Sequence, residues 1–231
     1  MVVIAALFLA FSVIAAVIVE RNTVVQQITR RDAAAAQLSR LSNALLEYSV
    51  FNKSGSVLLY PCPAASDQNE NTSAFGTKTA GCDIGIPSGT ALSGSMIIGM
   101  VPVQALAQYG ISFNDAFDPW NNRIMYAVNR KLTTGSPVLT TEQPNNPTIT
   151  DSATSLAIAS PDFILISYGR DGAGAIKRGS TSVSIACPTT GTPLRGQNCD
   201  GNTSFVIAPT NTTAAAGSTT YFDDILSYYR Q

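Results

Sequence analysis

The N-terminal stretch of the chain is apolar almost without interruption. From Met1 to Val19 every residue except Ser12 is apolar. A helix of this length reaches about 28 Å, close to the hydrocarbon thickness of a bilayer, so the pattern predicts a transmembrane helix over residues 1–19. Two alternatives stay open. One is a cleaved signal peptide, for which Ile14-Ala15-Ala16 is a poor cleavage match, and the other is a helix buried in a soluble fold.

Beyond Glu20-Arg21 the apolar positions take up a helical period. No Pro or Gly occurs until Gly55, and apolar residues recur at spacings of three and four along one face. We therefore predict one stalk helix over residues 1–52, followed by a globular head over residues 53–231. A membrane helix with a separate amphipathic helix after it is the alternative. The apolar positions of that face are Ala34, Leu38, Leu41, Leu45 and Tyr48.

After residue 55 the pattern changes to short β-type runs separated by turn residues, which indicates an antiparallel sheet with loops. Together with the long helix, this predicts one α+β domain. The predicted strands are residues 123–130, 162–168, 181–186 and 203–208, with a short helix over 102–109 and a long exposed loop over 133–155.

The amino-acid composition of the chain excludes several classes of function. Fourteen Lys plus Arg stand against fifteen Asp plus Glu, so the chain has no positive surplus for nucleic acid, and no nucleic-acid partner is expected. Histidine is absent, which excludes Ser-His-Asp and Cys-His nucleophiles and histidine metal ligands. Close carboxylate pairs occur, but spacing in sequence does not place two of them across a cleft. We therefore expect no enzymatic activity and no cofactor.

Four cysteines occur, at spacings that fit no zinc pattern. Three disulfide pairings are formally possible. Pairing between sequence neighbours, Cys62 with Cys82 and Cys187 with Cys199, closes short loops that each contribute about 3 kcal/mol, and we predict these two bonds. Disulfides imply an oxidising compartment for the head, whereas buried free thiols are the alternative.

Several head residues have expected structural roles. Pro119 restricts a turn, Trp120 offers a large apolar side chain to the core, and the Asp118 carboxylate can cap nearby backbone amides. A stacking platform for a sugar or a base is the alternative role for Trp120. The glycine-rich run from Gly169 to Gly174 fits a turn at the end of a strand better than a phosphate-binding loop, because no convincing helix follows it.

Five local motifs resemble, in the same order along the chain, those of the type IV pilin and type II secretion pseudopilin superfamily. Each is weak alone, but together they span the head, and they follow an apolar helix that runs into an amphipathic one. The matching segments are Tyr60 to Ala64 (YPCPA), similar to L-P-C-P-A; Gly99 to Leu106 (GMVPVQAL), similar to G-x-x-P-x-x-x-L; Asp118 to Asn121 (DPWN) with Tyr126, similar to D-P/A-W-G and a later Tyr; Leu165 to Gly169 (LISYG) with Asp171 and Gly172, similar to I-S-x-G-x-D/N-G; and Phe222 to Ile225 (FDDI), similar to F-D-D-I.

The resemblance implies a pilin-like fold, in which a long helix packs on a small antiparallel sheet. It implies a non-enzymatic structural subunit of a type II secretion pseudopilus or a type IV pilus-like filament, whose partners are the inner membrane and other pilin-like subunits bound through the stalk. It also implies a single-pass protein of the bacterial inner membrane, with the head on the periplasmic or extracellular side. The signature residues carried over are Asp118, Pro119, Trp120, Tyr126, Gly169, Gly172, Phe222 and Asp223.

Some features depart from that superfamily. Its basic leader, Gly cleavage point and early acidic residue are missing ahead of the apolar run, and Asn121 replaces the signature Gly. The positive-inside rule would moreover place Arg21, Arg30 and Arg31 in the cytoplasm, on the same side as the cysteines. We therefore expect the reading frame to begin upstream of Met1, with a basic segment.

Calcium is the one metal ion whose binding the sequence leaves open. Major pseudopilins bind it with an acidic loop late in the head, whereas the segment after Gly172 (AGAIKRGSTSVS) lacks carboxylates. Asp171, Asp223 and Asp224 offer the hard oxygen ligands that calcium prefers, but they are too few for a complete site.

One other function remains open from the sequence. The chain could instead be a membrane-anchored extracytoplasmic binding or adhesion module, with the loop over residues 133–155 as its recognition surface.

Overall fold

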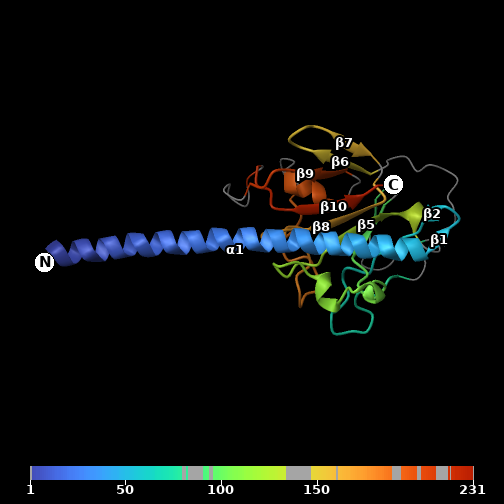
Figure 1. Ribbon diagram of the computed structural model, residues 1–231, viewed down its shortest axis with the longest axis horizontal. Helices are drawn as coiled ribbons and strands as arrows, with labels where there is room; N and C mark the ends of the chain where they lie inside the picture. The colour runs from blue at the N-terminus through green and yellow to red at the C-terminus, as the bar shows by residue number, and fades with distance from the viewer. Residues whose placement is uncertain are drawn as a thin grey trace.

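A computed structural model shows a mixed α+β protein in which one long helix extends from a head built of β-strands (Figure 1). Helix α1 runs without a break from Val2 to Phe51 over 50 residues, which corresponds to about 75 Å. The structure describes the backbone of residues 2–79, 82, 91–93, 96–133, 147–159, 161–188, 194–201, 204–211, 218 and 220–230, and the side chains of these residues except 2–22, 91–93, 158, 159 and 195.

The predicted location in a bacterial inner membrane is wrong. Within the described residues, no helix combines the length and the apolar character that a membrane crossing requires. The described side chains of α1 begin at Thr23 and include the charges of Arg30, Arg31 and Asp32, which are costly in hydrocarbon. The side chains of the predicted transmembrane segment, residues 1–19, lie outside the described set.

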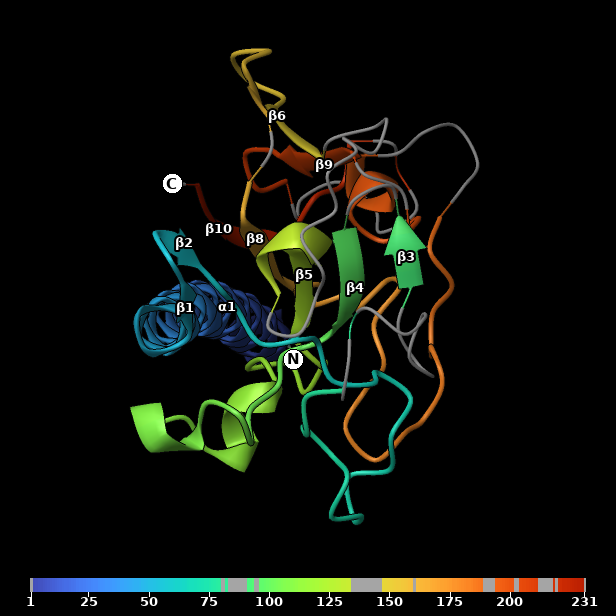
Figure 2. The same ribbon diagram turned by 90° about the vertical axis from the view of Figure 1, so that its right-hand side faces the viewer.

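Five antiparallel strands form the main sheet, in the order β10-β8-β5-β4-β3 (Figure 2). Neighbouring strands are paired in continuous register, for example Tyr126 with Leu165 and Val128 with Phe163. The strands are β3 (Ala91–Ser93), β4 (Met96–Met100), β5 (Met125–Asn129), β8 (Phe163–Ser167) and β10 (Ile225–Tyr229).

The central strands of this sheet are buried on both faces, and their side chains alternate between two cores. Tyr126 and Val128 of β5 join the core under α1, whereas Ala127 joins the core on the opposite face. Helix α1 contributes its predicted apolar face to the first core, which confirms that face as the side of the helix that packs on the sheet. The helix residues in that core are Leu38, Leu41, Ala44, Leu45 and Tyr48.

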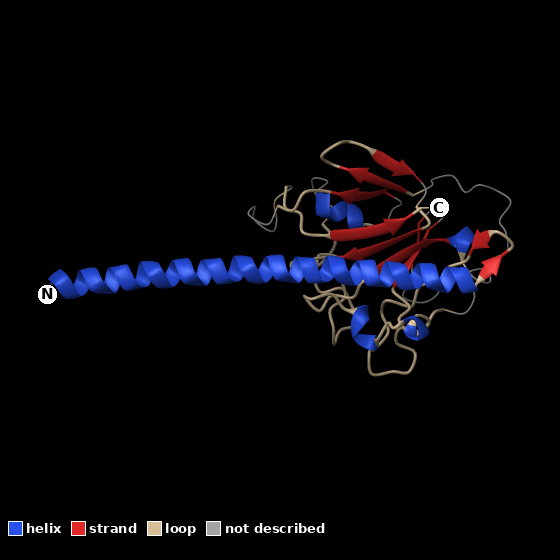
Figure 3. Ribbon diagram, in the orientation of Figure 1, coloured by secondary structure: helices blue, strands red, loops and turns tan. Residues whose placement is uncertain are grey.

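A small second sheet covers the other core (Figure 3). It has the order β7-β6-β9, and it contributes Ile149 of β6 and Phe205 of β9 to that core. The β6–β9 pair is parallel, unlike the fully antiparallel head predicted from the sequence. The remaining elements are β6 (Thr148–Asp151), β7 (Ala157–Ala159), β9 (Ser204–Ile207), the hairpin β1 (Lys53–Ser54) and β2 (Val57–Leu58), and the 3-10 helices η1 (Ala107–Tyr109), η2 (Phe113–Ala116), η3 (Arg130–Leu132) and η4 (Leu194–Asn198).

Several predicted elements differ from the structure. Three predicted strands correspond to β5, β8 and β9, but residues 181–186 form only isolated bridges, through Val183 and Ile185. The predicted helix over 102–109 is reduced to turns and the 3-10 helix η1. The predicted loop over 133–155 contains β6, and its residues 134–146 lie outside the described set.

Candidate functional site

Helix α1 is fastened to the head by polar contacts as well as by its apolar face. The Gln37 side-chain amide donates to the backbone carbonyls of Asp115 and Phe117, at 3.2 and 2.8 Å. Arg40 forms an ion pair with the Asp115 carboxylate, which also accepts from the Ser112 backbone and hydroxyl. These contacts hold α1 against the segment that leads directly into the Asp118 motif.

The part of α1 that precedes this contact extends beyond the head (Figure 1). Among the side chains of α1 that the structure describes, those nearest the N-terminus include three large aliphatic ones that are exposed: Val24, Val25 and Ile28 are 51%, 60% and 55% exposed. They lie at spacings of one, three and four residues and so cover one side of the helix. Apolar side chains grouped in this way on a projecting helix form a surface suited to packing against another protein.

The Asp118 carboxylate is the centre of a buried polar network. Its Oδ1 accepts the backbone N–H groups of Trp120 and Asn122, at 2.9 and 2.8 Å. Its Oδ2 accepts the Ser167 hydroxyl at 2.7 Å and the Asn122 side-chain amide at 3.2 Å. Burial raises the pKa of Asp118, while these hydrogen bonds act in the opposite direction. The predicted capping role of Asp118 is therefore confirmed.

Asn122 connects this network to the turn after β8. Its side-chain amide also donates to the Gly169 carbonyl at 2.6 Å. Gly169 and Gly172 both have φ of 62°, which glycine adopts without strain, and a Cβ on Gly172 would lie 2.7 Å from the Asn122 Oδ1. The turn thus requires glycine both for its backbone and for its close approach to Asn122. The run from Gly169 is a turn at the end of a strand, as predicted.

Asp223 lies on the other side of the same turn. Its Oδ2 accepts the backbone N–H of Asp171 at 3.0 Å and the Tyr221 hydroxyl at 3.2 Å, while its Oδ1 is buried and no described residue donates a hydrogen bond to it. Burial, followed by the nearby charge of Asp171, raises the pKa of Asp223 to about 6. From α1, an Arg31 amino group lies 3.5 Å from the Asp223 backbone carbonyl.

The three candidate calcium ligands do not form one cluster. Asp171 and Asp223 are neighbours, but the Asp224 carboxylate accepts the side-chain amide of Asn198 at 2.9 Å, in a separate group that also binds the backbone of β9. Among the described residues, no group of three His, Cys, Asp or Glu side chains is placed to hold a metal ion.

The aromatic signature residues have different environments. Tyr126 is fully buried, and its hydroxyl donates to the Pro61 carbonyl at 3.1 Å, which joins the YPCPA segment to the sheet. Phe222 is also buried. Trp120, predicted as a core side chain, is instead only partly buried and belongs to none of the hydrophobic clusters of the described residues. The turn at Asn121, with φ of 64°, directs the following Asn122 rather than Trp120 into the interior.

Both predicted disulfides are present. Cys62 is bonded to Cys82 with their Cα atoms 5.9 Å apart, and Cys187 to Cys199 with 5.6 Å. The first bond packs against Ile97 of β4, and the second lies beside the closely approaching Gly174. Two disulfides favour an oxidising, extracytoplasmic environment.

Sequence reasoning identified most members of this network but not their partners. Asn122, Ser167, Asn198 and Tyr221 were not singled out, and only the fold brings them to the signature residues.

No protein-family model, no curated protein and no solved structure matches the chain.

Proposed function

We propose that the chain is a structural subunit of a filament of the type II secretion pseudopilus or type IV pilus kind, and that it assembles through the projecting part of α1. The observation that carries this proposal is a continuous helix of 50 residues, which is fastened to the head through its C-terminal part and exposes Val24, Val25 and Ile28 before that contact.

The energetics of the helix support self-association. Fully burying an exposed Val or Ile side chain contributes about 1.5 to 3 kcal/mol. Covering these three half-exposed side chains gains about half of that for each, which favours contact with a neighbouring subunit. The head supplies the rigidity that an array requires, because α1 is held by an apolar face, an ion pair and two hydrogen bonds from Gln37. The order of the five motifs in the sequence adds to this proposal as a resemblance.

Site-specific cross-linking tests the proposal. A photoreactive amino acid at Val25, in the full chain produced in its own host, should give a ladder of cross-linked copies of this chain, identified by mass spectrometry. The same probe at Val50 is the control, because Val50 is also half-exposed on α1 but lies near the head end of the helix.

A charge at the proposed contact provides the second part of the test. Ile28→Asp should abolish the ladder from Val25, since a carboxylate would be buried without a partner. Val50→Asp should leave it intact. A ladder that persists in Ile28→Asp, or cross-links from Val25 to unrelated proteins alone, would overturn the proposal.

A further inference from the structure

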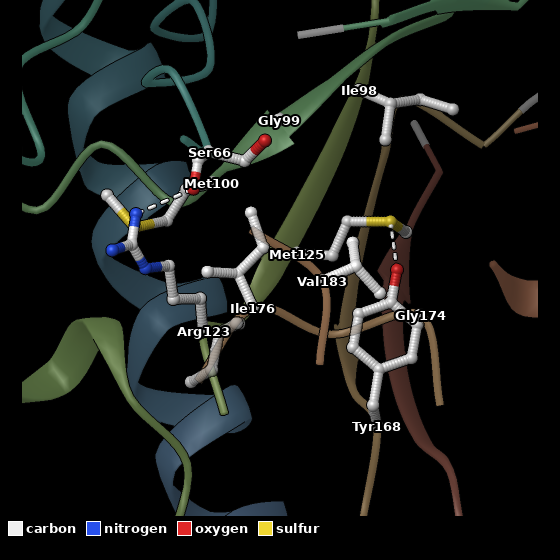
Figure 4. A pocket seen from close by; sticks show the side chains of 11 residues that line it. Ser66, Ile98, Gly99, Met100, Arg123, Met125, Tyr168, Gly174, Ile176 and Val183 are labelled. Carbon is white, nitrogen blue, oxygen red and sulfur yellow. Dashed lines mark hydrogen bonds between the residues drawn. The ribbon is translucent and has the colours of Figure 1, made fainter. Parts of the chain in front are cut away.

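A pocket of about 250 Å³ lies beside the main sheet, at the ends of β4 and β5 that carry Met100 and Met125 (Figure 4). Strands β4 and β5 form one side of it and the segment over residues 174–183 the other. Most of its lining is apolar, and the polar side chains in it are those of Ser66, Arg123 and Tyr168. The apolar side chains around it are Ile98, Met100, Ile124, Met125, Ile176 and Val183.

Arg123 brings a buried positive charge to this pocket. Its side chain is among those that line it, yet the residue is only 3% exposed. One amino group donates to the Ser66 carbonyl at 2.6 Å and the other to the Ser180 carbonyl, whereas the Nε–H has no hydrogen-bond partner among the described residues. A buried guanidinium with an unused N–H favours an acceptor at that position.

The charge of Arg123 faces the Phe75 ring, whose centroid lies 5.1 Å from the guanidinium carbon, but no described carboxylate is bonded to it. Both ion pairs among the described residues belong to other arginines, Arg40 and Arg178. Burial lowers the pKa of Arg123, and the more distant carboxylates of Glu70 and Asp67 act against this effect. Because a buried cation without a paired anion is costly, an anionic group that entered the pocket would be favoured by the charge as well as by the free N–H.

A second weakly bonded donor lines the same pocket. The Tyr168 hydroxyl donates to the Met125 sulfur, 2.9 Å away, and a thioether is a weak acceptor. Figure 4 shows Arg123 on one side of Met125, Ile176 and Val183, and Tyr168 on the other. The pocket therefore combines apolar walls with two donors that an oxygen acceptor would satisfy better than the protein does.

We propose that this pocket binds a small organic carboxylate with an apolar body, whose carboxylate accepts from the Nε–H of Arg123 and whose body packs between Met125, Ile176 and Val183. The size of the body follows from the volume. A dry apolar cavity of about 150 Å³ holds benzene, so this pocket suits a substituted ring of roughly ten non-hydrogen atoms.

Fluorine NMR tests the proposal with two probes of matched shape. 4-Fluorobenzoate should bind the purified full chain with a Kd below about 1 mM, and 4-fluorobenzyl alcohol at least tenfold more weakly. The carboxylate is the difference that Arg123 recognises. Equal affinity for the two probes, or no binding of the benzoate, would overturn the proposal.

Two tryptophan variants test the position of the bound probe. Val183 lines the pocket and is 48% exposed, whereas Ile185, two residues further along the chain, is 43% exposed and is not among the lining residues. Val183→Trp should weaken benzoate binding at least tenfold, while Ile185→Trp should leave it unchanged. Equal effects of the two variants would place the probe elsewhere and contradict the proposal.

Arg123→Gln tests the basis of the preference. It should remove the preference for benzoate over the alcohol, since the buried charge is gone. Because Arg123 also joins the Ser66 and Ser180 loops, thermal unfolding of this variant is measured alongside. If Arg123→Gln does not fold, Arg123→Lys replaces it, and we expect at least fivefold weaker benzoate binding from loss of the Nε–H. A folded variant that keeps the full preference would overturn the role assigned to Arg123.

Discussion

The Ser167 hydroxyl donates a hydrogen bond of 2.7 Å to the Oδ2 of Asp118, across 49 residues of sequence. This bond joins the end of strand β8 to the DPWN segment that precedes β5. Since Asp118 also accepts two backbone N–H groups of its own turn, one carboxylate orders a loop and fixes it to the sheet. The motif therefore acts as a structural connection inside the head.

The first prediction concerns the size of this contribution. Asp118→Ala should lower the free energy of unfolding by about 3 kcal/mol or more, because it leaves buried backbone and hydroxyl donors without an acceptor. Asp118→Asn should cost less, about 1 to 2 kcal/mol, since it retains the acceptor for both backbone N–H groups. Denaturant titration of the two variants measures the difference, and a larger loss for Asn than for Ala would contradict the network as described.

The second prediction is a dependence of stability on pH. The pKa of Asp223 is raised to about 6 by burial and the Asp171 charge, whereas an unfolded Asp has a pKa near 4. The folded state therefore keeps a proton that the unfolded chain loses, and stability falls as the pH rises from about 4 to about 6, by up to about 3 kcal/mol. Above that range the loss levels off.

Asp223→Asn is the variant that isolates this effect. It should remove the fall in stability between pH 4 and 6 and make the protein more stable than the wild type at pH 7. The charged and titratable groups around Asp223, namely Asp171, Asp224, Arg170, Arg31 and Tyr221, stay in place, so the difference between the two pH profiles reports Asp223 alone. Superimposable profiles would contradict the raised pKa.

The sequence predicted the elements whose pattern is strong. Strands β5 and β8 alternate between two apolar cores, and the face of α1 from Leu38 to Tyr48 has a clear helical period, so local pattern and fold agree. The sequence around β6 predicts a loop, because Thr, Pro, Asn and Ser dominate it. Residues 181–186 have the alternating pattern of a strand, with Val183 and Ile185 between polar residues, yet both side chains are exposed and form only isolated bridges.

The candidate site was predictable only in part. Turn glycines and a capping Asp follow from local chemistry, so Gly169, Gly172 and Asp118 could be identified from the sequence. Their partners could not. Asn122 reaches the Gly169 carbonyl across 47 residues and Asp223 reaches the Asp171 backbone across 52, and such contacts exist only once the sheet order is set.

The third prediction concerns the disulfides. Replacing both Cys187 and Cys199 by Ser should lower the free energy of unfolding by about 3 kcal/mol, and so should replacing both Cys62 and Cys82, because each bond restrains the unfolded chain. Non-reduced peptide mapping of protein recovered from its native compartment should show both links. Recovery of four alkylatable thiols would contradict their presence there.

The last prediction compares two glycines with similar backbones and different surroundings. Gly169 has φ of 62° and Gly179 has φ of 79°, so alanine is strained at both positions, by about 1 to 2 kcal/mol. A Cβ on Gly169 would also collide with the Asp223 carbonyl oxygen and lie 2.6 Å from its Oδ2, whereas a Cβ on Gly179 meets no atom within 4 Å. Gly169→Ala should therefore lower the free energy of unfolding by at least about 2 kcal/mol more than Gly179→Ala, since the backbone at Asp223 must shift. Denaturant unfolding of both variants measures the two losses in free energy of unfolding. Equal losses would show that Asp223 does not pack against this turn, and that the network around Gly169 is looser than its hydrogen bonds indicate.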